Sequence, residues 1–520
     1  MRKWAPLLTI CLSTFMLLLD VTIVSVAIPS IATALKSSFA ALQWSFDLYV
    51  LVLAALLLAV GSASDRLGRR FVFVLGLAVF TLASLACGLA PTSAVLIVAR
   101  GAQGVGAAAM LATNAALIGS SYAGRDRGTA FGVWGGVMGA ASAAGPILGG
   151  LLTEHISWRA IFLVNIPVGI LAILLAVRTV SESRNPASGR IDLPGAVTFT
   201  AAVTLLVYGL IEAGDRGWTD RSALIAFGGA ALCLIGFVAL ENGRRHPMLD
   251  LALFRRPSFA ALMLGGAILH LAAFGNIIYV SIWAQSLLGM NPVTAGLVLT
   301  PLSGVAFMVA VFAGRRLHHV GPQYLIGIGL VLIGIGTLLN LVLLTGNASW
   351  PVLLPGLCVT GVGVGLASPV VASATLAAAP PERAGMATGA INTFRQLGFA
   401  FAVPLFATVL AGGARQVLGA SGLYRDPSAA AVQLAGGRGR AMLAGTPGPH
   451  DLVVRTLHQA YAAGLDWIFG ISAVVGILTG LAVVLVVKPN PRPAWQSGGA
   501  AGGAGSPGAP AAAPATSSSS

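Results

Sequence analysis

Apolar stretches of membrane-spanning length follow one another along almost the whole chain, from Trp4 to Val487, with short polar gaps between them. A helix of roughly 20 residues crosses ~30 Å of hydrocarbon at ~1.5 Å per residue. Fourteen such stretches predict an all-helical integral membrane protein. The predicted spans are 5–28, 42–63, 71–90, 94–117, 128–152, 159–177, 193–212, 222–240, 258–283, 293–313, 323–344, 351–378, 386–411 and 463–487.

The amino-acid composition supports a membrane protein. Hydrophobic residues make up 57% of the chain and charged residues 9%, whereas soluble domains carry about 25% charged residues. The apolar run after Lys3 continues past Asp20 to Pro29, so it is long enough to span rather than to act as a cleaved signal peptide. The four cysteines lie inside apolar spans without CxxC spacing, and we expect no disulfide framework, metal site or cofactor.

The formal net charge of +14 raises the question of nucleic-acid binding, but the basic residues lie in short loops between the spans. With the N-terminus placed inside, nineteen Lys or Arg residues fall in cytoplasmic segments and nine in outer segments. An excess of basic residues in cytoplasmic loops is the positive-inside pattern. We therefore expect a multi-pass protein of the cell (inner) membrane, with both termini cytoplasmic and no nucleic-acid partner.

An internal repeat divides the chain. The segment 61–70 returns in weaker form at 314–323, each time between two spans. The repeat predicts two homologous six-helix halves, 1–190 and 246–490, with the two spans of 191–245 inserted between them.

Two further segments have unusual compositions. A long outer loop at 412–462 is rich in Gly, Ala and Arg without clear periodicity, and the cytoplasmic tail at 491–520 consists mainly of Gly, Ala, Pro and Ser. Segments of this composition bury little apolar surface. Both are expected to be disordered.

Two acidic residues lie inside predicted spans. Asp20 is ~12 Å and Asp47 ~7.5 Å from the outer ends of the first two spans, at ~1.5 Å per residue. A central Asp raises the free energy of insertion by ~2.5–3.5 kcal/mol, so it should face a water-filled cavity or a polar partner. In low dielectric a carboxylate takes up a proton more readily, which suits Asp20 for proton coupling. Asp47 is expected to meet it across the cavity; a structural hydrogen bond is the alternative role for Asp20.

Aromatic residues surround Asp47. Trp44, Phe46 and Tyr49 lie within three residues of it. Aromatic faces and a carboxylate together attract positive charge in a dry pocket, so these four residues predict a binding site for a lipophilic cation. An aromatic belt at the membrane interface is the alternative interpretation.

Other polar groups also fall inside spans. Arg100 is a permanent charge in the fourth span and should need an acidic or polar partner. Arg395 places a second fixed charge in the thirteenth span, and His270 and Asn276 add polar groups to the ninth. We expect Arg395 and Asn276 to contribute to substrate binding.

The fifth span is rich in glycine. Gly139, Gly145, Pro146 and Gly149 belong to a series in which glycines recur at four-residue spacing. Such spacing builds smooth helix faces that pack closely against other helices, and Pro146 adds a kink point. A generic packing face explains part of this pattern.

The loop between the second and third spans reads Gly61-Ser-Ala-Ser-Asp65-Arg66-Leu-Gly68-Arg69-Arg70. With the motifs above, it resembles the major facilitator superfamily, specifically its fourteen-span drug:proton antiporter family, over residues 5–490. The resemblance implies a gating charge network in this loop, a proton-relay motif at Arg100 and an antiporter motif at Gly145, Pro146 and Gly149. The second-half repeat departs from the pattern, with His318 in the place of Asp65.

These features predict a secondary transporter that exports amphipathic, often cationic, drugs in exchange for protons by alternating access. Asp65 is expected to close the cytoplasmic side by capping helix ends and pairing with a charge such as Arg125. A dedicated exporter of one endogenous metabolite or antibiotic is the alternative, and a non-transporting sensor is a third. No nucleophile–base pair or phosphate-binding loop supports an enzyme. Small-molecule substrate, protons and lipid are the expected partners of a monomer.

Overall fold

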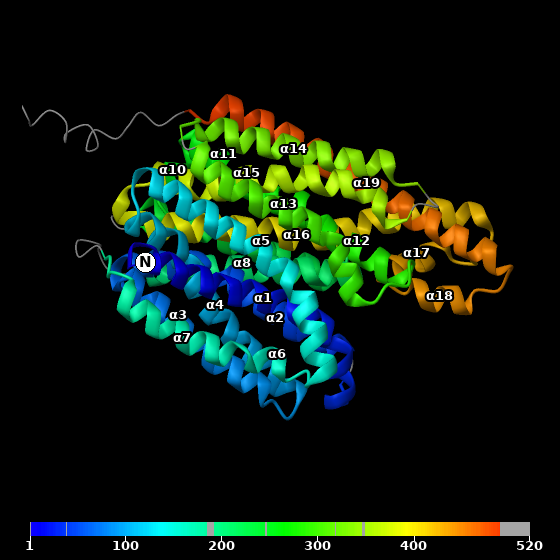
Figure 1. The fold of residues 1–520 in the computed structure, drawn as a ribbon. Coiled ribbons are helices and arrows are strands. Elements are labelled where there is room, and N and C mark those ends of the chain that lie inside the picture. Colours follow the sequence, from blue (N-terminus) through cyan, green and yellow to red (C-terminus); the bar gives the residue numbers. More distant parts are fainter. Residues whose placement is uncertain are drawn as a thin grey trace, which may run out of the picture.

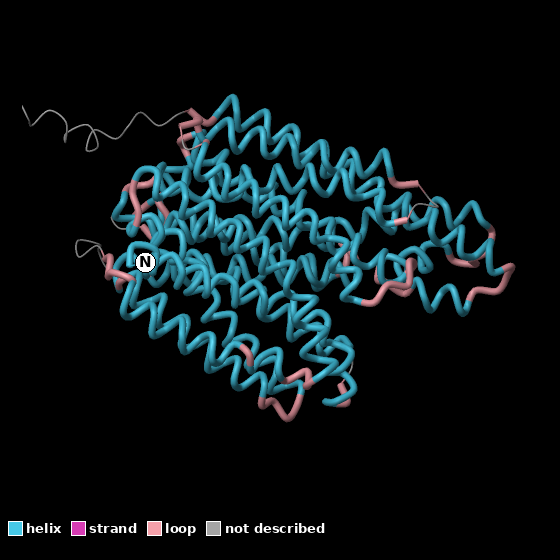
Figure 2. Tube along the Cα trace, viewed as in Figure 1, coloured by secondary structure: helices cyan, strands magenta, loops and turns pink. Residues whose placement is uncertain are grey.

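The structure is a computed structural model, and it describes residues 2–37, 39–184, 192–244, 247–317, 319–345 and 349–488. Long helices joined by short loops make up this part of the chain (Figures 1 and 2). Thirteen of the described helices are long and apolar enough to cross a membrane. The helix α5, with 32 residues at Gly124–His155, is less apolar because it begins with charged residues and is rich in glycine. It contains the predicted span 128–152, and the expected all-α fold with about fourteen spans is confirmed.

The surface of the helix assembly is apolar. Large hydrophobic side chains are exposed along many of the long helices, which would be unfavourable over such an area in water and suits contact with lipid. Examples are Leu82, Val98, Ile225, Leu232, Val342 and Leu485.

The first seven helices form what we call the N-terminal bundle. In it α3 packs against α4, α2 against α4, and α1 against α5 and α7. The sixth predicted span is divided by a turn into α6 and α7, which follow each other closely. The helices are α1 (Ala5–Leu35), α2 (Phe39–Leu67), α3 (Arg69–Gly88), α4 (Ser93–Ser121), α5 (Gly124–His155), α6 (Ala160–Leu163) and α7 (Asn165–Thr179).

The helices from α11 onward form what we call the C-terminal bundle. Its ninth predicted span is interrupted by a π-helix, η2 (His270–Phe274), which joins α11 to α12. In it α14 packs against α15 and α19, and α16 against α11 and α19. The long helices are α11 (Pro257–Leu269), α12 (Gly275–Ser286), α13 (Pro292–Arg316), α14 (Pro322–Leu343), α15 (Leu354–Ala378), α16 (Ala384–Ser421) and α19 (His450–Val486).

Two helices between the bundles, α8 (Leu193–Arg216) and α9 (Arg221–Asn242), pack against each other. The helix α8 also contacts α2 of the N-terminal bundle and α16 of the C-terminal bundle. On the α2 side, the ring of Tyr208 stacks on Trp44 with 6.1 Å between centroids. On the α16 side, Trp218 Nε1, in the turn after α8, donates to Thr408 Oγ1 at 2.7 Å. The pair α8–α9 therefore lies across the line where α2 meets α16.

The expected disorder of the outer loop 412–462 is wrong. The helix α16 continues to Ser421, two short helices follow, and α19 begins at His450 (right side of Figure 1). The short helices are α17 (Pro427–Ala435) and α18 (Gly439–Gly445). Asp426 caps α17 by accepting from the backbone N–H of residues 428 and 429, and alanine, the residue that favours helix most, fills much of the segment. The predicted tail at 491–520 lies outside the described residues.

The two bundles meet mainly along two pairs of helices, α5 with α13 and α2 with α16. The second pair meets where α2 ends and α16 begins, and we call this the Asp65 end of the assembly. A Cβ atom on Gly61 would lie 2.5 Å from the carbonyl oxygen of Gly385, so only glycine permits this approach of the two helices. The helices α17 and α18 lie at the opposite end (Figure 1).

Candidate functional site

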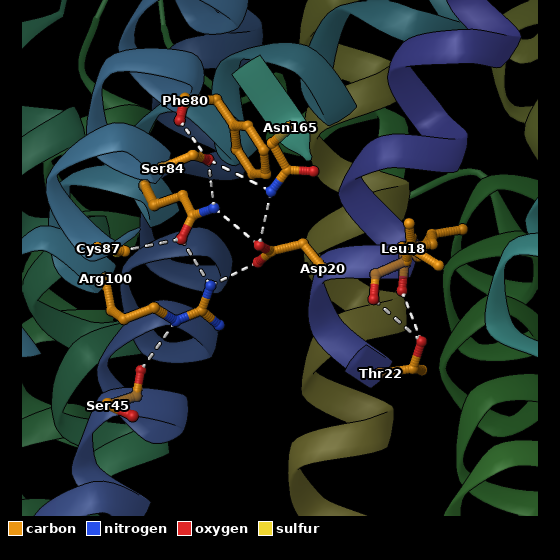
Figure 3. Close-up of polar contacts among 11 residues, drawn as sticks. Leu18, Asp20, Thr22, Ser45, Phe80, Ser84, Cys87, Arg100 and Asn165 are labelled. Atoms are coloured by element: carbon orange, nitrogen blue, oxygen red, sulfur yellow. Dashed lines mark hydrogen bonds and ion pairs between the residues drawn. The ribbon is translucent and has the colours of Figure 1, made fainter. Parts of the chain in front are cut away.

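The carboxylate of Asp20 lies in the middle of α1 and is 1% exposed. Arg100 Nη1, on α4, donates to Asp20 Oδ2 at 2.5 Å. Gln103 Nε2, also on α4, and Asn165 Nδ2, on α7, donate to Asp20 Oδ1 at 2.8 and 3.1 Å (Figure 3). Both carboxylate oxygens are therefore occupied by donors from two other helices.

The guanidinium of Arg100 is fully buried and held on several sides. Besides Asp20, it donates to the backbone oxygen of Ser45 on α2 at 3.2 Å and to Gln103 Oε1 at 2.7 Å. The ring of Tyr49 lies under it, with 4.0 Å from the ring centroid to Cζ. The acidic partner that the sequence required for Arg100 is thus Asp20. Because both charges are out of water, removing one partner of such a pair costs about 3–5 kcal/mol.

Sequence reasoning did not single out the amides that complete this network. Gln103 follows Arg100 by three residues and so lies on the same face of α4, a spacing that would have identified it. Its Nε2 also donates to Ser84 Oγ at 2.8 Å, on α3. Asn165 stands at the start of α7 as an intramembrane amide. Its role depends on the packing of α7 against α1, which no local pattern gives.

The residues of the predicted cation site around Asp47 contact different parts of the molecule. Trp44, Phe46 and Asp47 are half-buried on α2. Tyr49 is fully buried beneath Arg100, whereas Trp44 stacks on the inserted helix α8. The hydrogen bonds that the structure gives Asp20 come from α4 and α7, and the expected meeting of Asp20 with Asp47 stays a prediction.

Asp65 joins the two bundles at the end of α2. Its Oδ1 accepts from Arg69 Nη2 at 2.7 Å and from the backbone N–H of Gly385 at 2.7 Å, and its Oδ2 accepts from the N–H of Met386 at 2.9 Å. A carboxylate at these N–H groups caps α16 and complements the positive end of its dipole. The expected helix cap is present, and the charge that pairs with Asp65 is Arg69 rather than Arg125, which is exposed on α5.

The rest of the predicted gating loop supports the start of α3. Gly68 has φ of 110°, a left-handed conformation that favours glycine. Glu182 caps α3 by accepting from the backbone N–H groups of Arg70 and Phe71, both at 3.1 Å. Arg70 also forms a long ion pair with Glu182, 4.0 Å from Nε to Oε2, and Arg66 is exposed.

The glycines of the predicted antiporter motif place α5 between α1 and α13. A Cβ atom on Gly145 would overlap the hydroxyl of Thr22, two residues after Asp20. One on Gly149 would lie 3.0 Å from the carbonyl oxygen of Ile23, and one on Gly139 would lie 3.2 Å from that of Ser303 on α13. The motif therefore seats α5 directly beside the Asp20 site. The side chain of Pro146 lies outside the described part of the structure.

In the C-terminal bundle, Arg395 on α16 is 3% exposed, and its Nη2 donates to the backbone oxygen of Ser368 at 2.7 Å. Its Nε and Nη1 have no hydrogen-bond partner among the described residues. Asn276 Nδ2 donates to the backbone oxygen of Ala272 at 3.0 Å, and His270 Nδ1 lies 3.1 Å from that of Gly266. These two polar side chains thus bond to their own helix around η2. His318 lies outside the described residues.

The sequence is similar to a protein-family model and to proteins named for drug resistance. The family model described as Major Facilitator Superfamily matches residues 10–403. The multidrug resistance protein Stp of Mycobacterium tuberculosis is 35% identical over 401 residues, covering 77% of this chain and 74% of that protein. The tetracenomycin C resistance and export protein of Streptomyces glaucescens is 32% identical over 507 residues, covering 94% and 93%.

Among solved structures, the proton:xylose symporter XylE superposes with a TM-score of 0.62. The superposition covers 94% of this chain and 96% of XylE at 15% sequence identity. An identity this low establishes a shared helical fold and nothing about substrate.

Proposed function

Because the chain belongs to the Major Facilitator Superfamily, a family of transporters and not of enzymes, we propose that it exports amphipathic, often cationic, drug-like compounds in exchange for protons. Two relatives named for drug resistance cover three quarters or more of its length, and one of them is also named for export, which supports efflux as the direction of transport.

The main support for proton coupling is the buried ion pair between Asp20 and Arg100. A proton that reaches Asp20 Oδ2 neutralises the carboxylate, and the ion pair with Arg100 Nη1 is then lost. Arg100 stays charged, so the network around it must rearrange. Since α5 packs on α1 two residues from Asp20, such a rearrangement reaches the helix that also contacts α13 of the other bundle. Proton binding and substrate binding then influence each other by the same factor.

Alternating access requires that the two bundles separate at one end while they close at the other. The Asp65 end is closed in this structure by the cap on α16 and by the approach of Gly61 to Gly385. We assign this end to the cytoplasmic side, in agreement with the positive-inside pattern. Opening toward the cytoplasm must break the two hydrogen bonds that N–H groups of α16 donate to Asp65.

The substrate is proposed to meet Asp47 and its aromatic neighbours on α2. Trp44, Phe46 and Asp47 are half-buried, so they keep surface available to a ligand, whereas Tyr49 is covered by Arg100. A carboxylate beside aromatic rings favours a lipophilic cation. Asn276 and Arg395 are proposed to contribute from the C-terminal bundle.

Efflux of a fluorescent lipophilic cation tests this function, measured in cells with and without a protonophore at matched expression. Wild type is expected to expel the dye, and either the protonophore or Asp20→Asn to abolish the efflux. Asp47→Asn is expected to weaken export of cations selectively. Asp466→Asn is the matched control, since it changes a membrane-embedded acid on α19, outside the site. Efflux that survives both the protonophore and Asp20→Asn would contradict proton coupling through this residue.

A dedicated exporter of a single antibiotic is a second candidate. It is favoured by the relative named for tetracenomycin C, which matches this chain over more of its length than Stp does. Competition separates the two functions: unrelated drugs should inhibit efflux of the dye by a multidrug exporter. A dedicated exporter should move none of the dyes and respond to one compound class.

A further inference from the structure

Arg395 is a buried cation for which the described part of the chain offers no acid. It lies eleven residues into α16, or ~16 Å from the start of that helix, which is about half of the membrane thickness. Its Nη2 bonds to a neutral backbone oxygen, and its Nε and Nη1 bond to none of the described residues. Arginine keeps its charge at any physiological pH.

Burying such a charge without a counter-charge is unfavourable, because the guanidinium loses its hydration and gains little in return. The N-terminal bundle shows how this chain neutralises an arginine at membrane depth, since Arg100 has Asp20, Gln103 and a backbone oxygen around it. Two donors of Arg395 therefore point to an acceptor that none of the described residues supplies.

Arg395 packs against α11 and α15 of the C-terminal bundle and lies one helical turn from residues that contact the N-terminal bundle. Asn392, one turn earlier on α16, donates from Nδ2 to the backbone oxygen of Leu111 on α4 at 2.9 Å. Gly389, one turn earlier again, lies against Leu57 and Leu58 of α2. On the other side, a Cβ atom on Gly266 of α11 would lie 3.6 Å from Arg395 Cγ. Separation of the bundles therefore exposes the side of α16 next to Arg395.

We propose that Arg395 binds an anionic oxygen of the transported compound, a carboxylate or a phenolate, through Nε and Nη1. Charge-assisted hydrogen bonds of this kind are about twice as strong as neutral ones, and a desolvated site strengthens them further. The substrates then include acids or zwitterions in addition to cations. This inference rests on the proposed export function, and it adds the chemical class of a substrate group.

The test compares one compound in two forms, a lipophilic carboxylic acid and its neutral amide, with the fluorescent cation as a third substrate. Transport is measured in proteoliposomes with wild type, Arg395→Gln and Arg395→Lys under a proton gradient. Arg395→Gln is expected to lower the ratio of acid to cation transport by at least about tenfold, and Arg395→Lys to restore part of it. The amide should not respond to the change of charge.

The outcomes separate this inference from the proposed function. Equal losses for acid, amide and cation in Arg395→Gln would assign the residue a structural role and overturn the inference. Wild type that moves the cation but not the acid would also overturn it, while the export function stands. Wild type that moves neither compound contradicts the export function itself.

Discussion

Arg100 and Arg395 are both buried arginines in the middle of long helices, one in each bundle, and their surroundings differ. Arg100 is enclosed by a carboxylate, an amide, a backbone oxygen and an aromatic ring. Among the described residues, Arg395 donates a hydrogen bond to one backbone oxygen only. A charge with a titratable partner can respond to a proton, whereas a charge with free donors can respond to a ligand. In the proposed function, Arg100 therefore takes part in proton coupling, and Arg395 takes part in recognising the substrate.

The largest expected effect comes from removing each charge in turn. Arg100→Met leaves Asp20 buried without its counter-charge and should lower the free energy of unfolding by about 3–5 kcal/mol. Arg395→Met removes a charge that has no counter-ion among the described residues and should lower it by less than about 1 kcal/mol, or raise it. Thermal melting of both variants in the same detergent measures the difference. Similar losses of stability in the two variants would show that the surroundings of the two arginines do not differ in energy.

Asp65 extends the comparison, because it pairs with Arg69 and also caps α16. Asp65→Ala should weaken the closed Asp65 end by about 2 kcal/mol, since α16 loses the acceptor for two N–H groups. We expect the maximal rate of efflux to change more than KM. Asp126→Ala is the control, because its ion pair with Lys3 is exposed to solvent. A change confined to KM would argue against a gating role.

A smaller effect is expected from the glycine contact at the same end. Gly61→Ala places a methyl group 2.5 Å from the carbonyl oxygen of Gly385, so the bundles cannot close fully there and the closed state should lose about 1 kcal/mol or more. Spin labels on Arg66 and Arg383 would report a larger separation between the bundles. Gly412→Ala, where a Cβ meets open space, should leave the distance unchanged. An unchanged distance in Gly61→Ala would refute the close contact.

The smallest effect concerns Tyr49. Its ring lies on Arg100, but its hydroxyl has no hydrogen-bond partner in the part of the chain described. Tyr49→Phe should therefore change the melting temperature and efflux very little, by less than about 0.5 kcal/mol in stability. Tyr49→Ala should lose the cation–π contact and packing. A strong and selective loss of dye binding in Tyr49→Phe would instead indicate that the Tyr49 hydroxyl binds the substrate.

The spans were predictable because hydrocarbon imposes a length and a composition on every helix that crosses it. The short helices α17 and α18 were missed because their composition resembles that of a disordered segment, and only packing against α16 and α19 distinguishes them. The need of Arg100 for an acid followed from its charge, but the choice of Asp20, eighty residues away, depends on tertiary structure. Arg69 stands four residues after Asp65, but α2 ends between them, so its pairing with Asp65 depends on the turn at Gly68 that joins α2 to α3.

The contacts of α8 have a consequence for movement between the bundles. Tyr208 holds it to Trp44 on α2, and Trp218 in the next turn holds it to Thr408 on α16. When α2 and α16 shift against each other, α8 cannot keep both contacts, so it must travel with one bundle and slide over the other. We propose that the pair α8–α9 then covers the opening between the bundles and keeps lipid tails out of it.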